Sequence, residues 1–89
     1  MMLNFPNPCR NFDASKNRIR FWGYDSAIEV SFFIETDALK QLCPEMDDVE
    51  SGFLKAFDAA REQIHEVADR AYRRDENSHY SCILSVEDF

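Results

Sequence analysis

The stretch RIRFWGYDSAIEVSFFIE, residues 18–35, decides the fold of this chain. Its second part, residues 27–35, carries a large apolar side chain at every other position, and this period of two is typical of a half-buried antiparallel strand. Residues 18–24 alternate in the same way, and the segment from Gly23 to Ser26 contains residue types that favour a tight turn. The stretch therefore predicts two antiparallel strands joined by a turn.

Further elements follow from the spacing of apolar residues on either side of this ribbon. Residues 36–42 form a short helical turn before a proline. From residue 47 to about residue 74, apolar side chains recur every three or four positions, which predicts one long helix. Residues 79–86 alternate again and predict the last strand. Residues 9–17 read as a loop, because turn-forming residues are frequent there.

These elements predict a small α+β domain in which the long helix packs on one face of an antiparallel sheet of three or four strands. A length of 89 residues suits a single domain over residues 1–89. The residues expected on the helix-covered face are Ile19, Phe21, Ile28, Val30, Phe32, Ile34, Tyr80, Leu84 and Val86. A helix of that length measures ~40 Å, against ~30 Å for a compact domain of this size. The helix is therefore expected to overhang the sheet, to bend, or to reach a second subunit.

The charge of the chain is unevenly distributed. The net charge is −7, and it all falls on residues 41–89, which carry five basic and twelve acidic groups. Nucleic-acid binding needs basic groups that neutralise phosphates, so a nucleic-acid partner is not expected.

The cysteines and the first residues indicate the compartment. Cys9, Cys43 and Cys82 are odd in number and widely spaced, whereas a secreted disulfide scaffold carries an even, denser set. Residues 1–12 lack a basic leader followed by an apolar run, so no signal peptide is expected. No apolar run approaches the ~18 residues of a membrane span. We therefore expect a cytoplasmic protein with no membrane partner.

Several short motifs follow one another along the chain in a recognisable order. They are Phe5-Pro6, Phe12-Asp13, Ile19-x-Phe21, the strand around residues 28–34, Leu39, Arg61, Ile64 and Ala68, and Asp88-Phe89. Their order resembles the bacterial domain-of-unknown-function family numbered 1488 over essentially the full length. The resemblance implies a small stand-alone α+β protein of proteobacteria. It transfers no catalytic or ligand residues, although a link to transcriptional regulation is attached to some relatives.

Alternation also leaves large side chains on the sheet face that the helix does not cover. Trp22, Phe33 and Ile83 fall there, with Arg18 and Arg20 at the rim. An apolar spot rimmed by polar groups is typical of a partner-binding surface. These five residues are our candidate binding surface, for a second copy of the chain, another protein or a ligand.

Two other arrangements would bury this face within the chain itself. In the first, the N-terminal segment with Leu3, Phe5 and Phe12 folds over the face and covers it. In the second, a β-bulge near Gly23 turns Trp22 inward. The sequence leaves both open beside a homodimer interface.

Other reactive side chains give weaker signals. His65 and Asp69 lie one helical turn apart, but two ligands fall short of the three or four of a zinc site. We expect a solvated helix flank there, with no metal and no cofactor. Cys43 is far in sequence from either histidine, and Cys82 falls on the core side of its strand, so neither is expected to act as a nucleophile. His79 is expected at the surface.

The sequence thus favours a non-enzymatic interaction or regulatory module that works as a homodimer. The first alternative is a small-molecule-binding protein or enzyme with a pocket between sheet and helix, near Tyr80, His65 and Cys82. The second is a DNA-associated regulator that acts through the basic cluster ending the long helix. That cluster consists of Arg70, Arg73 and Arg74.

Overall fold

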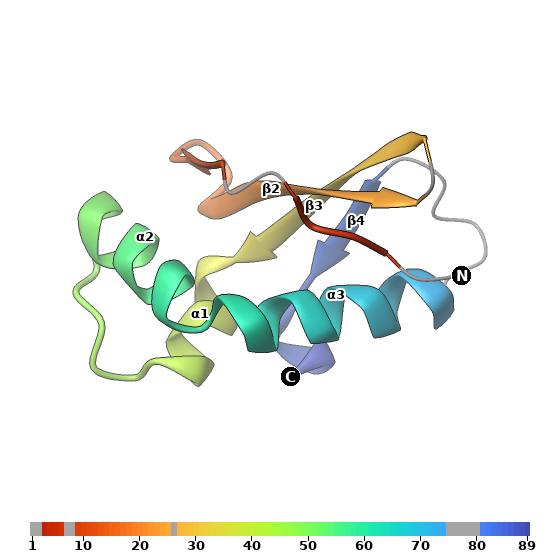
Figure 1. Ribbon diagram of the computed structural model, residues 1–89. Coiled ribbons are helices and arrows are strands. Elements are labelled where there is room, and N and C mark those ends of the chain that lie inside the picture. Colours follow the sequence, from red (N-terminus) through yellow and green to blue (C-terminus); the bar gives the residue numbers. More distant parts are fainter. Residues whose placement is uncertain (1–2, 7–8, 26, 75–80) are drawn as a thin grey trace.

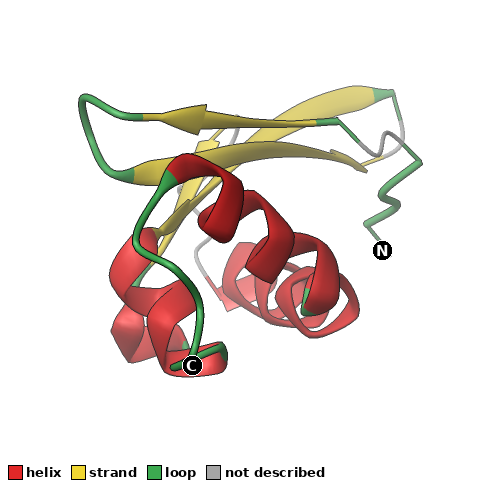
Figure 2. Cartoon of the chain, turned by 90° about the vertical axis from the view of Figure 1, so that its left-hand side faces the viewer, coloured by secondary structure: helices red, strands yellow, loops and turns green. Residues whose placement is uncertain are grey.

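A four-stranded sheet and three helices form two layers, which confirms the predicted α+β class. The computed structural model describes residues 3–6, 9–25, 27–74 and 81–89. The elements are β1 (Arg10–Asp13), β2 (Arg18–Asp25), β3 (Ile28–Glu35), α1 (Thr36–Leu42), α2 (Glu50–Ala59), α3 (Arg61–Arg74), β4 (Ser81–Leu84) and the 3₁₀ turn η1 (Val86–Asp88) (Figure 1). The helices lie on one side of the sheet (Figure 2). Among the described residues, none of the helices has the length and apolar character that crossing a membrane requires.

The central hairpin of β2 and β3 confirms the prediction made from residues 18–35. The two strands are antiparallel over eight residue pairs, from Arg18 opposite Glu35 to Asp25 opposite Ile28. The turn is shorter than predicted, because Gly23 pairs with Val30 inside the sheet instead of belonging to the turn.

The order of the strands is β1-β2-β3-β4, and two details differ from the sequence-based prediction. Residues 10–13, predicted as part of a loop, form an edge strand antiparallel to β2. The predicted antiparallel sheet is mixed, because β4 runs parallel to β3. Parallel neighbours need a long crossover connection, and the three helices between β3 and β4 provide it.

The predicted long helix is two helices, and α1 forms as predicted. At Ala60 the backbone leaves helical geometry, with φ −106° and ψ 17°. Its carbonyl nevertheless accepts the Ile64 N–H at 2.9 Å, so α3 starts directly after the break. The molecule measures 35 × 24 × 24 Å, which is shorter than a continuous helix of ~40 Å. The helical segment therefore bends, one of the three predicted outcomes, and α2 turns away from the line of α3 (Figure 1).

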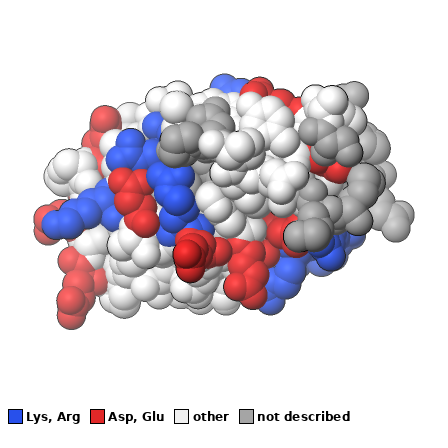
Figure 3. Space-filling model, in the orientation of Figure 1, with Lys and Arg blue, Asp and Glu red and all other residues white. Residues whose placement is uncertain are grey.

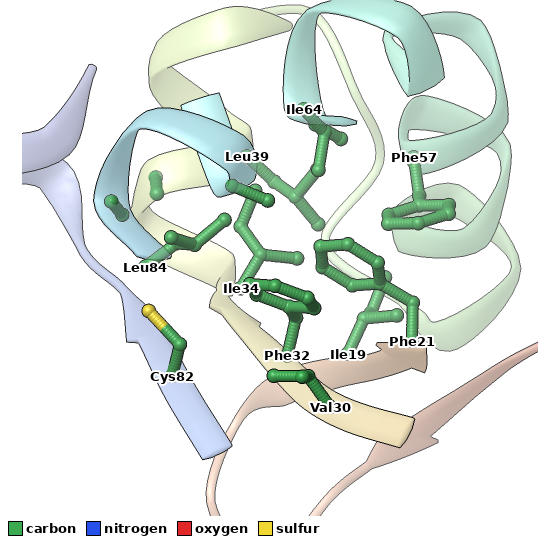
Figure 4. Packing of buried hydrophobic residues seen from close by; sticks show 13 residues of the cluster. Ile19, Phe21, Val30, Phe32, Ile34, Leu39, Phe57, Ile64, Cys82 and Leu84 are labelled. Atoms are coloured by element: carbon green, nitrogen blue, oxygen red, sulfur yellow. The ribbon is translucent and has the colours of Figure 1, made fainter. Parts of the chain in front are cut away.

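The core lies between the sheet and the helices and is dominated by aromatic rings. Phe21 and Phe32 project from neighbouring strands with ring centroids 5.3 Å apart, and Phe57 from α2 lies 5.2 Å from Phe21. Leu39 from α1 and Ile64 from α3 close the cluster (Figure 4). Burial of these side chains supplies the main driving force for folding.

Two residues predicted on the buried face are exposed at the surface. Ile28 is 47% exposed and Val86 41% exposed, so their predicted burial is wrong. Ile28 starts β3 at the hairpin end of the sheet, and Val86 starts η1, where the alternation of a strand no longer applies. Tyr80 lies outside the described residues.

The N-terminal segment runs beside β2 on the helix side of the sheet. Asn4 exchanges two backbone hydrogen bonds with Tyr24, of 2.9 and 2.8 Å. The ring of Phe5 packs against Phe32, with centroids 5.8 Å apart. A Cβ on Gly23 would lie only 2.8 Å from Cε1 of Phe5. The missing side chain at Gly23 therefore makes room for the N-terminal segment.

Candidate interaction surface

The outer face of the sheet, opposite the helices, brings together the five residues proposed from the sequence. Arg20, Phe33 and Ile83 form one row, because Phe33 pairs with Arg20 on one side and with Ile83 on the other. Trp22 and Arg18 flank this row on β2. Ile83 is 54% exposed, Arg20 is exposed, and the other three are half-buried. Polar and apolar groups thus alternate over three neighbouring strands.

Arginine side chains lie over the aromatic rings of this face. The guanidinium carbon of Arg18 lies 3.9 Å from the ring centroid of Phe33. That of Arg20 lies 5.1 Å from the ring of Trp22, and its Nη2 donates a 3.0 Å hydrogen bond to Oγ of Ser31. Cation–π contacts of this kind hold a flexible cation in place. The surface is therefore partly preorganised.

Neither arrangement that would bury this face within the chain is found in the described residues. The three N-terminal residues expected to cover it pack instead against the core on the helix side: Leu3, Phe5 and Phe12. The alternative of a bulge near Gly23 is also not found, because Trp22, Gly23 and Tyr24 pair in unbroken register with β3. No described segment crosses the outer face (Figure 2).

The predicted pocket between sheet and helix is not supported by the placement of its described residues. The imidazole of His65 stacks on the ring of Phe5, with centroids 4.0 Å apart. Cys82 is buried on β4, on the far side of β3 from β2. Among the described residues, surface hollows occur elsewhere: one of about 410 Å³ lies beside Cys43, and one of about 260 Å³ lies between α3 and Asp88.

The solvated flank predicted around His65 is confirmed for Glu62 and Glu66, which are exposed, but the ring of His65 itself is half-buried. Burial lowers the pKa of His65 to about 4, and the positive charge of Arg61 acts in the same direction. Asp69, the possible co-ligand, pairs with Arg73 through Oδ2 at 3.2 Å. His79 lies outside the described residues.

The basic cluster at the end of α3 is largely compensated by carboxylates. Besides the Arg73–Asp69 pair, Arg74 donates a 2.7 Å hydrogen bond to Oδ1 of Asp88. Burial raises the pKa of Asp88, but hydrogen bonds from Arg74 and Ser85 outweigh this effect and lower it overall. On the face shown in Figure 3, basic and acidic side chains are interspersed around a broad uncharged area. This face therefore lacks the continuous basic stripe typical of nucleic-acid-binding surfaces.

Two polar contacts in the structure join segments far apart in the sequence and were not predicted. Arg10 makes a bidentate pair with Asp58 at 2.9 and 2.8 Å, and Arg61 reaches the same carboxylate at 2.7 Å. The hydroxyl of Tyr72 bonds to buried Asp25. Neither pair leaves a local sequence signal, because each depends on how the two layers meet.

The comparisons with known proteins agree with this fold. The family model described as "Protein of unknown function (DUF1488)" matches residues 3–84. The crystal structure of a protein of unknown function from the DUF1488 family of Shewanella loihica PV-4 matches with a TM-score of 0.75 and 19% sequence identity, covering 91% of each chain. At this identity the likeness concerns the fold alone. A search of curated proteins found no match.

Proposed function

The chain belongs to the DUF1488 family, as the order of its motifs predicts, and from this premise we propose that it is a non-enzymatic cytoplasmic interaction module whose outer sheet face binds a second copy of itself. The observation that carries the proposal is the row formed by Arg20, Phe33 and Ile83, beside Trp22. Aromatic residues and arginine are enriched in protein interfaces. A surface isoleucine that is 54% exposed gains from burial by a partner.

The charges on this face are arranged so that the face can complement itself. Arg18 and Arg20 lie toward one end of β2, and Glu29 lies opposite Tyr24 toward the other end. When two copies meet face to face with their strands in opposite directions, the arginines of one copy approach Glu29 of the other. Such complementary charges fix the orientation of a complex more than they add affinity.

The size of the face bears on the strength of the dimer. Strands β2 and β3 have eight residues each and β1 and β4 have four each, so at about 3.3 Å per residue and about 4.8 Å between strands the face projects over roughly 400 Å². A standard interface buries about 800 Å² of accessible surface per partner. A stable dimer therefore requires the whole face, and we expect reversible association in the micromolar range.

The non-enzymatic part of the proposal is supported by the separation of His65 from Cys82. A thiol enzyme needs a base within hydrogen-bonding distance of its nucleophile. His65 is stacked on Phe5 above β2, whereas Cys82 lies on β4. The layer between sheet and helices is filled by the aromatic core.

Sedimentation velocity from low to high micromolar concentration tests the dimer. Ile83→Glu is expected to abolish concentration-dependent association. The matched control is Val49→Glu, because Val49 is 55% exposed and lies at the start of α2, in the other layer. This control should associate like the natural sequence. A monomer at every concentration, or a dimer that tolerates Ile83→Glu, would refute the proposed interface.

A further inference from the structure

The N-terminal segment is seated in a narrow aromatic slot between β2 and α3. The ring of Phe5 lies parallel to the imidazole of His65, with an interplanar angle of 7° and a centroid distance of 4.0 Å. The ring centroids of Phe21 and Phe32 lie 6.3 and 5.8 Å from that of Phe5. Gly23 forms the floor, since a Cβ there would meet Phe5 at 2.8 Å. The slot thus accepts one flat ring, and Phe5 fills it.

Among the described residues, few other contacts hold this segment. Asn4 is tied to Tyr24 by two backbone hydrogen bonds, and Leu3 is partly buried against the core. Segments with few buried contacts open locally at lower free energy than the rest of a fold. The packing of Phe5 in the slot therefore decides whether residues 3–6 stay on the sheet.

The surroundings of His65 provide two alternative positions for its ring. Of the described residues, residues 3–6 and β2 present uncharged rings to it, those of Phe5 and Phe21. On α3, Asp69 lies one turn further on, and its Oδ1 is buried without a hydrogen-bond partner. A side chain four positions away on a helix is within reach. A neutral imidazole suits the stack on Phe5, and an imidazolium suits the unpaired oxygen of Asp69.

The remaining charged groups near His65 do not remove this preference. Arg61, one turn before it, disfavours a second positive charge, although Asp58 holds the Arg61 guanidinium at 2.7 Å. Glu62 and Glu66 are exposed on α3, where water screens their charges. Burial of the imidazole favours its neutral form and lowers its pKa to about 4.

We propose that residues 3–6 form an acid-released latch, in which protonated His65 turns from Phe5 to Asp69 and the N-terminal segment leaves the sheet. Release would unpair the backbone N–H and C=O of Tyr24 that now bond to Asn4. It would also uncover the apolar slot above Gly23. An unpaired strand edge beside apolar surface is a template for strand addition. Acid thus converts a closed sheet edge into an open one.

Amide hydrogen exchange on the full chain tests the latch, because the Tyr24 amide donates to the Asn4 carbonyl at 2.8 Å while the segment lies on the sheet. The Phe32 amide, in the central strand β3, reports global unfolding in the same sample. With a His65 pKa of about 4 in the closed state and about 6.5 in the open state, the protection factor of Tyr24 should fall roughly twentyfold between pH 7 and pH 5. Global unfolding also exposes His65, so the protection of Phe32 should fall by about the same factor but stay far above that of Tyr24 at both pH values.

Three variants separate the latch from other effects of acid. His65→Phe keeps a flat ring without a titratable nitrogen, and should abolish the fall in Tyr24 protection. Asp69→Asn removes the negative charge and should move the fall to lower pH. His79→Gln removes the other histidine and should behave like the natural sequence. The latch is refuted if Tyr24 is as strongly protected as Phe32, so that both exchange only by global unfolding, if His65→Phe keeps the fall, or if His65 titrates at its ordinary pKa by NMR.

Discussion

The hydroxyl of Tyr72 on α3 donates a 2.8 Å hydrogen bond to Oδ2 of Asp25 at the end of β2, across 47 positions of sequence. Asp25 is only 8% exposed and is the buried charged residue of the described core. The same hydrogen bond raises the pKa of Tyr72. The contact ties the end of α3 to the tip of the central hairpin, and so holds the two layers together at that end.

Tyr72→Phe is expected to lower the free energy of unfolding by about 1–3 kcal/mol, because it leaves a buried carboxylate oxygen without its donor. Urea unfolding measures this loss. Tyr24→Phe is the matched control, since its hydroxyl also bonds a carboxylate, Glu29, at 2.8 Å, but at the surface. The control should cost well under 1 kcal/mol. Equal losses in the two variants would contradict the role given to Asp25.

Gly23→Ala is expected to destabilise the fold by about 1–3 kcal/mol through overpacking. The added methyl group would lie 2.8 Å from Phe5 and 2.9 Å from Phe32. Phe5→Ala removes one of these clashes, so Gly23→Ala should cost less in that background. A double-mutant cycle measured by urea unfolding gives the coupling, expected at 0.5 kcal/mol or more. Simple additivity would show that Gly23 does not form the floor of the slot.

Asp58→Asn is expected to cost about 0.5–1 kcal/mol, because the ion pairs that join β1 to the α2–α3 corner are partly exposed. Lys40 and Asp48 form a more exposed pair, at 3.2 Å, so Asp48→Asn should change little. The cost of Asp58→Asn should shrink at high salt. A cost that is independent of salt would argue against an electrostatic role for Asp58.

The pairing of Asp58 also has a pH dependence with a definite sign. The hydrogen bond from Arg10 is the main reason why the pKa of Asp58 is lowered in the fold. Its stabilising effect is therefore complete above the unfolded pKa of about 3.9 and is lost as the pH falls through the lower folded value. The difference in stability between the natural chain and Asp58→Asn should narrow only below about pH 4. Urea midpoints measured from pH 3 to 7 check this.

Arg18 and Phe33 are half-buried, and they are expected to be coupled by about 0.5–2 kcal/mol, the range between exposed and desolvated cation–π pairs. Their separation of 3.9 Å is the shortest arginine–ring distance on the outer face. A double-mutant cycle of Arg18→Met and Phe33→Leu, measured on the monomer at low concentration, gives this energy. Arg20→Met in place of Arg18→Met should couple less, because Arg20 lies 5.9 Å from Phe33. Zero coupling at Arg18 would mean that the face is not preorganised by its arginines.

The sequence predicts the centre of this fold better than its periphery. The alternation within β2 and β3 is long enough to fix which side chains face the helices, and it also places Trp22 and Phe33 on the outer face. Strand β1 is missed because Asn11 and Asp13 are typical of turns, and only pairing with β2 makes this segment a strand. Alternation in β4 predicts a strand but carries no information on its direction.

The break between α2 and α3 and the seat of Phe5 could not be predicted for a different reason. Alanine is the best helix former, so nothing local marks Ala60 as a break, which arises where both helices pack on one small sheet. Pro6 interrupts the alternation of the N-terminal segment, so the side on which Phe5 falls is lost from the pattern. It is decided by the space above Gly23, a tertiary feature.

The parallel pairing of β3 with β4 has a consequence for how the chain is made. Paired residues such as Ser31 and Ser81 are 50 positions apart, so β3 is synthesised long before its neighbour. When the hairpin and the helices have left the ribosome but β4 has not, one edge of β3 has no neighbouring strand. Unpaired strand edges can pair with strands of other chains. Pairing of residues 81–84 with β3 should therefore be the last and slowest step of folding. A chain truncated before residue 81 should be prone to aggregate.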